Sequence, residues 1–350
     1  MRSHALARLL VPAAAIAPRA CLCLCLGACL CLGLGLALSP GDAIADKYAG
    51  EFLRIGVGAR ALGMGGAFTA LANDASAAYW NPAGLAQMER PEVLFMHAEQ
   101  FGQLANHDFF GYVQPLPGTT GTSVGLAVIR YGVDDIPITR DAWTDSNGNG
   151  KPDPGEFDPD DFRKASDTEW GVLFTYARSA SDRLQLGGNL KVVRQGLLHN
   201  TSFGMGVDLG ALYSVRRDLT IGARLADVTT TRISWDTGTR EVINPSMALG
   251  AQWTRELAGL RGEVTVAGDF AFTFEGRETA SQFGGGTVAG DFQGGVEYWF
   301  SRAVAARVGT TAGDWTAGGG IRYRGFGADY AFLPHDDLGD THRISASLRF

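Results

Sequence analysis

The stretch Thr201–Tyr213, TSFGMGVDLGALY, alternates two kinds of residue with a period of two. Apolar side chains such as Phe203 and Leu209 fall on one face, and Ser202, Asp208 and several glycines fall on the other. Successive side chains of a β-strand point to opposite faces, so the stretch predicts a strand with one apolar face. Its length and regularity favour a barrel that spans a membrane over a soluble sandwich, whose strands are shorter and less regular.

The same pattern recurs from Pro91 to Phe350. Fourteen segments carry it: 91–101, 106–116, 121–132, 168–179, 182–196, 202–215, 218–227, 244–255, 261–274, 290–300, 303–312, 315–324, 325–334 and 341–350. Single-chain bacterial barrels have an even number of strands, and about ten tilted residues span the apolar thickness of a bilayer. We therefore expect an all-β fold, a transmembrane antiparallel β-barrel of about 14 strands.

The connections between these segments sort by parity. Short connections follow every second segment, at 117–120, 180–181, 216–217 and 301–302. The connections between them hold every long loop, at 133–167, 228–243, 275–289 and 335–340. Outer-membrane barrels have short periplasmic turns and longer outer loops, whereas a sandwich has no reason to separate its loops in this way. The parity therefore orients the barrel, with its first strand running outward.

Composition excludes some functions. Of 350 residues only 19% are charged and the net charge is −7, which gives no reason to expect nucleic-acid binding, since that requires clustered Lys and Arg. Charged residues such as Asp208, Arg224, Glu297 and Arg307 share the face opposite to the apolar one. On a lipid-facing side each would cost about 2–4 kcal/mol near the midplane, so we expect them to face the lumen and the apolar face to meet outer-membrane lipid.

The N-terminus resembles a secretory signal peptide over residues 1–45. Arginines precede an apolar stretch with its core at Leu22–Leu38, all five cysteines lie between Cys21 and Cys31, and Ala43-Ile44-Ala45 offers an A-x-A cleavage site. Two alternatives are a retained membrane anchor and a lipidation box at Leu26–Cys29, although the apolar residues that continue past Cys29 argue against lipidation. After cleavage the chain would hold no cysteine, so neither a disulfide nor a thiol nucleophile is expected.

Two further segments complete the expected organisation. Residues 46–90 lack the alternation and are too few to bury a core alone, so we expect them to pack as a hatch, or plug, against or inside the barrel of residues 91–350. The final strand ends in the aromatic Phe350, the kind of end that barrel-assembly machinery recognises. Signal peptide, barrel and Phe350 together predict the bacterial outer membrane as the location.

A calcium-like loop lies inside the outer loop 133–167. Residues 145–156, DSNGNGKPDPGE, fit the twelve-residue calcium-loop pattern at every fixed position. The expected Ca²⁺ ligands are Asp145, Asn147, Asn149, the carbonyl of Lys151, Asp153 and Glu156. No convincing helices flank the loop, so the ion's expected role is structural, to stiffen the loop. The alternative is an acidic, turn-rich loop without an ion, because the same residues are common in turns.

No enzyme is expected from this chain. Gly121–Gly125 matches the G-x-S-x-G pattern, with Ser123 at the nucleophile position. That motif requires a turn from a strand into a helix, whereas here it opens a segment of the alternating region. The glycine content, 48 residues in all, makes a chance match unsurprising. Catalytic residues are therefore not assigned.

Two N-terminal segments resemble a known family. GARALGMGGAF at 58–68 and NDASAAYWNPAGL at 73–85 are similar to the N-terminal signature of the PorV/PorQ family, within the FadL-like (FadL/TodX) group of outer-membrane barrels. The ending from DLGDTHRI at 337–344 to Phe350 is similar to that family's C-terminus. The resemblance implies a fourteen-stranded barrel with a hatch. It implies hatch positions at Arg60, Gly63, Gly65, Gly66, Asn73, Asp74, Asn81, Pro82 and Ala83.

The resemblance implies transport and leaves two roles open. FadL-like proteins take up hydrophobic small molecules through a plugged barrel with a lateral opening, whereas PorV-like proteins serve type IX secretion and hold secreted protein cargo at the cell surface. The charged inner face fits a uniformly greasy conduit poorly. The alternative is a structural or interaction protein that binds surface partners through the calcium-stiffened loop, which neither family pattern explains.

Overall fold

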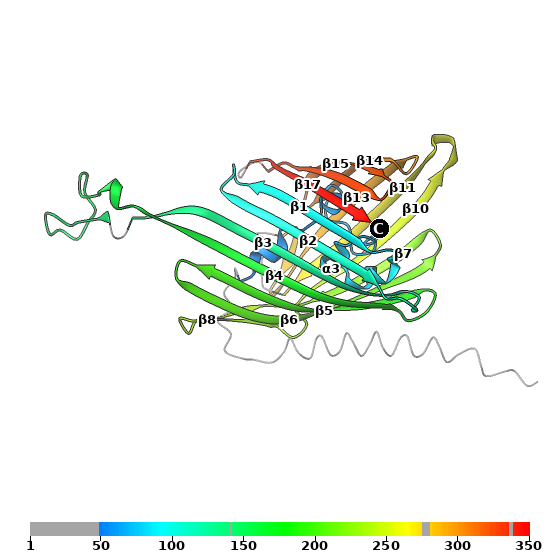
Figure 1. Ribbon diagram of the computed structural model, residues 1–350, viewed down its shortest axis with the longest axis horizontal. Helices are drawn as coiled ribbons and strands as arrows, with labels where there is room; N and C mark the ends of the chain where they lie inside the picture. Colours follow the sequence, from blue (N-terminus) through cyan, green and yellow to red (C-terminus); the bar gives the residue numbers. More distant parts are fainter. Residues whose placement is uncertain (1–48, 140–141, 275–280, 336–338) are drawn as a thin grey trace, which may run out of the picture. The chain divides into compact units, whose positions relative to one another are not determined.

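Residues 91–350 build a closed antiparallel β-barrel in the computed structural model, which describes residues 49–139, 142–274, 281–335 and 339–350 (Figure 1). Fourteen strands form its wall: β1 (Glu92–Gln100), β2 (Ala105–Pro115), β3 (Thr122–Ile138), β4 (Arg163–Ser179), β5 (Leu184–Leu197), β6 (Asn200–Arg216), β7 (Leu219–Ala226), β10 (Ser246–Leu257), β11 (Gly262–Thr273), β13 (Val288–Phe300), β14 (Val304–Thr311), β15 (Asp314–Tyr323), β16 (Phe326–Leu333) and β17 (Thr341–Arg349). The last strand pairs with the first, so the sheet closes on itself.

The predicted fold class is therefore confirmed. Each of the fourteen predicted segments overlaps one wall strand, because lipid on one side and the lumen on the other impose the alternation. Short turns separate β2 from β3, β4 from β5 and β6 from β7, as the loop parity predicted. The predicted signal peptide lies outside the described residues.

The structure corrects three predicted loops. The outer loop predicted at 133–167 is partly strand, because β3 and β4 remain paired from Val133–Asp167 to Ile138–Arg163 across a register shift, and Figure 1 shows this arm extending away from the barrel wall. The aspartates and Pro137 of this stretch are typical of loops, so the sequence pattern did not indicate a strand there. The loop predicted at 228–243 holds the hairpin β8 (Thr231–Trp235) and β9 (Arg240–Ile243), and the loop predicted at 275–289 holds β12 (Phe283–Gly285).

The two faces of the wall differ as the alternation requires. On β6, Phe203, Met205 and Leu209 are each between 43% and 53% exposed, whereas Ser202 and Asp208 are buried. The exposed set faces outward and the buried set faces the lumen. The predicted face assignment is thus realised, and a lumen this rich in buried side chains must be filled by another part of the chain.

Residues 49–90 fill it. This hatch consists of short helical turns, η2 (Glu51–Arg54), α2 (Ala59–Leu62), α3 (Ala77–Trp80) and η3 (Pro82–Gln87). Two further 3₁₀ turns, η5 (Pro159–Asp161) and η6 (Ala258–Leu260), lie in connections of the barrel. Within the described parts of the chain, no helix has the length and apolarity to cross a membrane.

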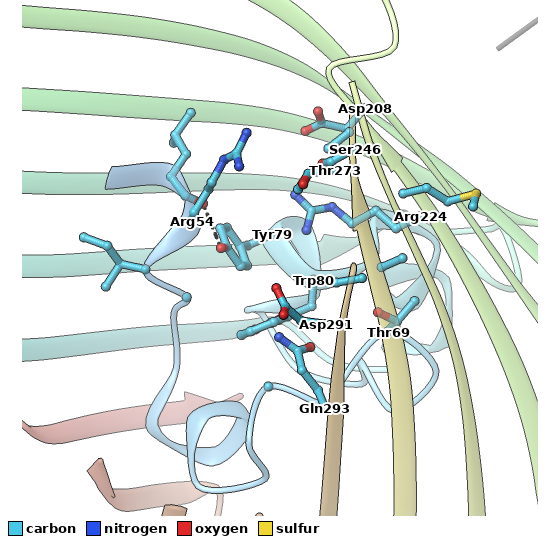
Figure 2. Close-up of a pocket in the computed structure, with 18 of the residues that line it drawn as sticks. Arg54, Thr69, Tyr79, Trp80, Asp208, Arg224, Ser246, Thr273, Asp291 and Gln293 are labelled. Carbon is cyan, nitrogen blue, oxygen red and sulfur yellow. Dashed lines mark hydrogen bonds between the residues drawn. The ribbon is translucent and has the colours of Figure 1, made fainter. Parts of the chain in front are cut away.

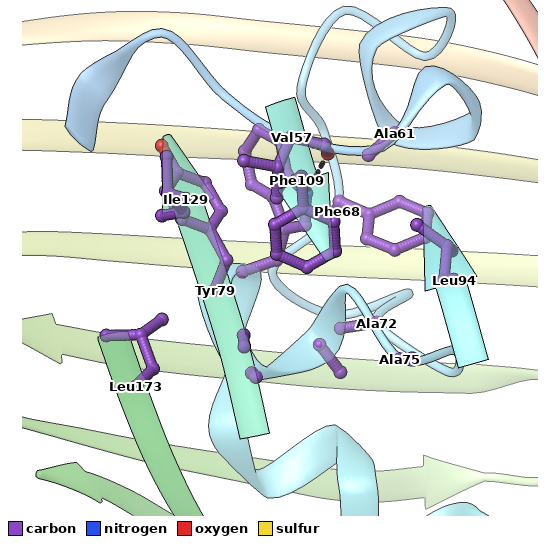
Figure 3. Packing of buried hydrophobic residues seen from close by; sticks show 14 of the residues in the cluster. Val57, Ala61, Phe68, Ala72, Ala75, Tyr79, Leu94, Phe109, Ile129 and Leu173 are labelled. Atoms are coloured by element: carbon purple, nitrogen blue, oxygen red, sulfur yellow. Dashed lines mark hydrogen bonds between the residues drawn. The ribbon is translucent and has the colours of Figure 1, made fainter. Parts of the chain in front are cut away.

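The main apolar core lies between hatch and wall. Phe68 and Val57 of the hatch pack with Phe109 of β2, Ile129 of β3 and other buried residues in one cluster (Figure 3). Phe68 also meets the Trp80 ring edge-on, with the ring centroids 6.2 Å apart. Burial of aromatic and branched side chains provides the main stabilisation here, at about 1.5–3 kcal/mol for each large side chain. The hatch is therefore part of the barrel's core.

Candidate functional site

An ion pair fixes the hatch to the wall. The Arg60 guanidinium donates from Nε and Nη2 to Glu297 of β13 at 2.9 and 2.8 Å. Arg60 Nη1 donates to Asn73 Oδ1 at 2.6 Å and lies 3.4 Å from Asp74 Oδ2. The Glu297 side chain is only 1% exposed, so the pair is largely shielded from solvent. Three of the expected hatch residues thus meet at one charge centre, and their partner Glu297 was not predicted.

The Asn81-Pro82-Ala83 turn is the second attachment. Asn81 caps η3 by accepting from Ala83 N at 3.2 Å, and Pro82 occupies the first turn, where no N–H is needed. The Asn81 amide nitrogen donates to Thr69 O at 2.8 Å and to Ala211 O of β6 at 3.1 Å. One side chain therefore fixes the turn, the preceding hatch loop and the barrel wall together.

Glycines on the wall permit a third kind of contact. Gly125, Gly187 and Gly222 are each the fourth residue of a strand that begins at a short turn, and hatch atoms lie directly against them. A Cβ on Gly222 would lie 2.5 Å from Thr69 O, and a Cβ on Gly309 would lie 2.3 Å from Gly65 N. The first three positions bring the hatch close to the strand ends that short turns join, whereas Gly309, the sixth residue of β14, lies nearer the other end.

Glycines of the hatch also permit close contact between the hatch and the wall. Gly65 and Gly66 adopt positive φ angles of 66° and 80°, which other residues rarely take. A Cβ on Gly65 would meet the Thr310 backbone at 2.3 Å, and one on Gly63 would meet Gly318 Cα at 3.2 Å. The resemblance singled out these glycines, and the structure brings Gly65 against β14, Gly63 against β15 and Gly66 against Gln293 of β13.

Above the hatch lies a cavity of about 340 Å³ (Figure 2). Thr273, Thr311 and Leu333 line it, and each stands at the end of its strand that leads to an outer loop. The hatch contributes Tyr79 and Trp80, whose rings meet edge-on at 5.0 Å between centroids. The cavity thus occupies the outer half of the lumen, and sequence reasoning did not predict it because its walls come from ten separate segments or more.

The cavity wall combines apolar and charged groups. Its apolar members include Leu53, Leu173 and Phe272, and its charged members include Lys191 and Arg224. Both charged side chains come from inward positions of strands, and Arg224 was among the residues that alternation placed on the inner face. A ligand could rest against the apolar part while polar groups fix its orientation.

The cavity reaches an interruption in the wall. The pairing of β7 with β10 stops at Ala226 and Ser246, and both residues line the cavity. The next residue, Asp227, has a φ of 55°, so the chain leaves the ladder there. Beyond it, β8 pairs with β6 and with β9.

Buried charges hold this interruption in place. Lys191 Nζ lies 2.6 Å from Asp227 Oδ1 and 2.9 Å from Asp208 Oδ1, and all three side chains are at most 7% exposed. Asp227 N also donates to Asp208 Oδ1 at 3.0 Å. The lone inward lysine in an alternating strand was the signal that could have revealed this cluster.

The calcium-like loop is held compact by hydrogen bonds among its own residues. Asp145 accepts from Asn149 N at 3.1 Å and from Gly150 N at 2.9 Å, while Asp153 accepts from Asn147 Nδ2 and Asn149 Nδ2. Glu156 closes the loop by accepting from Ser146 N at 3.0 Å and from Asp153 N at 3.1 Å. The expected ligand side chains are thus close together, and the Lys151 N–H is bonded to Asn149 Oδ1.

Hydrogen bonds within this loop favour the charged form of the Glu156 carboxylate. Hydrogen bonds from the backbone N–H of Asp153 and from the Trp143 and Ser146 donors hold the pKa of Glu156 below its usual range. Among the described residues, no group of three or more His, Cys, Asp or Glu side chains is arranged as a metal site. Calcium binding by this mixed set of carboxylates and amides stays a prediction.

The two remaining sequence candidates lie in the wall. Ser123 is fully buried in β3, a continuous strand, which lacks the turn into a helix that a nucleophile elbow needs. Phe350 is 61% exposed just past β17, and its backbone N–H bonds to Pro91 O at 3.1 Å. The assembly role expected of Phe350 stays a prediction.

Comparisons with known proteins agree with this architecture. Residues 37–134 match the model of the Uncharacterised protein family (UPF0164). A search of curated proteins found no match. Among solved structures, the toluene transporter TbuX of Ralstonia pickettii superposes with a TM-score of 0.56 at 15% identity, covering 84% of this chain and 98% of that one.

Two further solved structures give similar values. The toluene transporter TodX of P. putida has a TM-score of 0.55 at 12% identity and covers 84% of this chain and 99% of its own. A FadL homologue of Pseudomonas aeruginosa has a TM-score of 0.50 at 12% identity, with 84% and 98% covered. At such identities the likeness concerns the fold. This chain therefore has the fold of the FadL-like barrels, and with its apolar outer face it is a protein of the bacterial outer membrane.

Proposed function

We propose that this chain transports small hydrophobic compounds from the cell surface into the outer membrane and the cell. The observation that carries the proposal is the cavity of about 340 Å³, which lies in the outer half of the lumen above the attached hatch. TbuX and TodX, two solved structures of similar fold, are toluene transporters, which supports this class of solute. A compound of toluene's size fits the lower end of the volumes that ligand pockets have.

The hatch closes the direct path through the barrel. Opening it would separate Arg60 from Glu297 and break the Asn81 contacts to the wall. Breaking a buried ion pair alone costs about 3–5 kcal/mol, because a charge is left without its partner. A path that leaves the hatch in place therefore has the lower barrier.

The interruption beside Ala226 and Ser246 offers such a path. It adjoins the cavity, and a hydrophobic compound that passes it reaches the bilayer without crossing the hatch. Pro245 precedes β10 and has no N–H to continue the ladder, which keeps the pairing from closing there. We infer lateral release into the membrane between the β7–β10 pair and the β8–β9 hairpin.

The test is uptake of radiolabelled toluene by Gram-negative cells that express the full chain. Ser246→Trp would place an indole in the cavity beside the interruption and should reduce uptake about tenfold. Leu249→Trp is the matched control, since Leu249 is 44% exposed on the outer face of the same strand. Uptake no faster than in cells without the protein, or uptake that neither variant changes, would refute the proposal.

A second candidate role is the binding of a protein at the cell surface, as in PorV-like secretion or a surface interaction. It is supported by the arm of β3 and β4, which carries the calcium-like loop away from the wall (Figure 1). Removal of residues 139–162 should then release an exported protein from the surface while toluene uptake continues. Retention of all surface proteins after this deletion would exclude the second role.

A further inference from the structure

We propose that the cavity prefers small aromatic carboxylates and that Arg224 binds their carboxylate. This inference rests on the proposed transport function and names the substrate class of the same site. The binding involves no covalent change: the ligand's two oxygens accept hydrogen bonds from the guanidinium, and its ring rests on the hatch aromatics.

Most cations that face the lumen already have a carboxylate partner. Arg60 and Arg307 share Glu297, Arg322 pairs with Asp329 at 2.7 Å, and Lys191 pairs with Asp208 and Asp227. This pairing is expected, because an unpaired charge in a shielded site is costly. An inward cation without a carboxylate therefore requires an explanation.

Arg224 is such a cation. Within the described ranges it forms no hydrogen bond and no ion-pair contact, and its Nε is enclosed without an acceptor, although the Asp208 carboxylate is near enough to attract it. Its guanidinium lies over the Tyr79 ring, 5.2 Å from the centroid. The Tyr79 hydroxyl donates to Leu53 O at 2.7 Å, so the ring beneath the guanidinium is fixed. The arrangement holds five N–H donors at the cavity wall without giving them an acceptor.

The carboxylates in the cavity wall are occupied elsewhere. Asp208 accepts from Lys191 Nζ at 2.9 Å, from Asn189 Nδ2 at 3.1 Å and from Asp227 N at 3.0 Å. Asp291 Oδ1 accepts from Gln282 N at 2.8 Å. Figure 2 shows Arg224 projecting into the space between Asp208, Thr273 and Ser246. The acceptor that the guanidinium lacks can therefore come from a ligand in this space.

Arg343 provides a useful contrast. It too has no carboxylate partner among the described residues, but it bonds to His107 Nδ1 at 2.9 Å and does not line the cavity. Arg224 differs on both counts, since it lines the cavity and has no bonded neighbour. The open donor set is thus specific to the position that a ligand can reach.

The rest of the cavity indicates the ligand's body. Tyr79 and Trp80 of the hatch line it, and aromatic walls favour flat rings through stacked and edge-on contacts. The volume of about 340 Å³ favours a single ring over a long chain. A guanidinium matches a carboxylate bidentately, whereas a neutral hydrocarbon would leave its donors without partners. Benzoate combines both features and is ionised at neutral pH.

The experiment compares benzoate with toluene, two probes with the same ring and a substituent of one carbon. Uptake of both labelled compounds is measured at pH 7 in cells that express the full chain. Wild type should take up benzoate faster than cells without the protein do. Arg224→Gln should lower the ratio of benzoate to toluene uptake about tenfold, and Arg224→Lys should retain part of that ratio, because lysine keeps the charge but loses the bidentate fork.

Arg217→Gln is the matched control, since Arg217 is exposed in the turn before β7 and undergoes the same chemical change. It should leave the ratio unchanged. Toluene uptake without any benzoate uptake in wild type would overturn the inference and leave the transport function intact. Absence of both would instead contradict the transport function itself. An equal loss of both solutes in Arg224→Gln and Arg224→Lys would mean that Arg224 has only a structural role.

Discussion

Replacing Glu297 with Gln tests whether the central ion pair holds the hatch in the barrel. The Glu297 carboxylate accepts from Arg60 at 2.9 and 2.8 Å and from Arg307 Nε at 2.6 Å. Glutamine keeps the shape but removes the charge and directs an NH₂ group at guanidinium donors. Breaking a buried pair costs about 3–5 kcal/mol, and we expect about 3 kcal/mol because Arg60 retains Asp74 and Arg307 retains Asp329.

That energy predicts a measurable rise in hatch opening. A change of about 3 kcal/mol multiplies the open population roughly 150-fold. A cysteine introduced at Ala61, which is 0% exposed, reports the opening through its rate of alkylation, since residues 32–350 contain no other cysteine. When opening is fast relative to labelling, the rate follows the open population. We expect labelling about 150-fold faster in Glu297→Gln.

Glu256→Gln is the matched control. Glu256 pairs with Arg302 at 3.0 Å, but both side chains are more than 70% exposed beside a short turn, where such pairs contribute little. Correct assembly of each variant is checked by its heat-dependent migration on a gel. If the assembled Glu297→Gln protein is labelled at less than three times the wild-type rate, the pair does not hold the hatch.

Three other predictions follow from the hatch contacts and the outer loop. Gly309→Ala should destabilise the protein by about 1–3 kcal/mol, as overpacking does, because the new Cβ would lie 2.3 Å from backbone; Gly268→Ala, where the closest atom is 3.6 Å away, should leave the melting temperature nearly unchanged. Calorimetry should detect one Ca²⁺ per chain at millimolar affinity or better, and Glu156→Gln should abolish that binding while Asp158→Asn retains it. Acid should loosen the loop, because hydrogen bonds lower the folded-state pKa of Glu156. The stabilisation by the Glu156 charge is therefore present above the ordinary pKa of about 4.3. It is lost as the pH falls through the lower pKa of the folded state. Limited proteolysis between residues 145 and 156 that is as slow at pH 3 as at pH 7 would contradict this last prediction.

The sequence predicted the wall well because the wall obeys a local rule. Every second residue of a strand such as β6 meets lipid, so the pattern of Phe203, Met205 and Leu209 reports both strand and face without knowledge of any partner. Strand ends were less accurate where the lipid boundary no longer acts. The arm of β3 and β4 continues past the wall, and its aspartates and Pro137 have the composition of a loop.

The candidate site could not be predicted in the same way because its contacts are long-range. Arg60 meets a carboxylate 237 positions away, and Asn81 meets a carbonyl 130 positions away. Alternation placed Glu297 and Arg224 on the inner face but could not show that the first has two hydrogen-bonded partners and the second none. That difference depends on where the hatch lies in the lumen, which only the packed structure defines.

The glycine contacts between hatch and wall have a consequence for how this barrel can evolve. Gly125, Gly187, Gly222 and Gly309 bring the hatch against four different strands around the circumference, with no side chain on the wall position to take up a misfit. Because the diameter of a barrel grows with its strand number, one additional hairpin would withdraw the wall from the hatch, and the loss of one hairpin would crush it. The hatch thus fits only one barrel circumference. Duplication or deletion of a hairpin is tolerated only if the N-terminal segment changes with it.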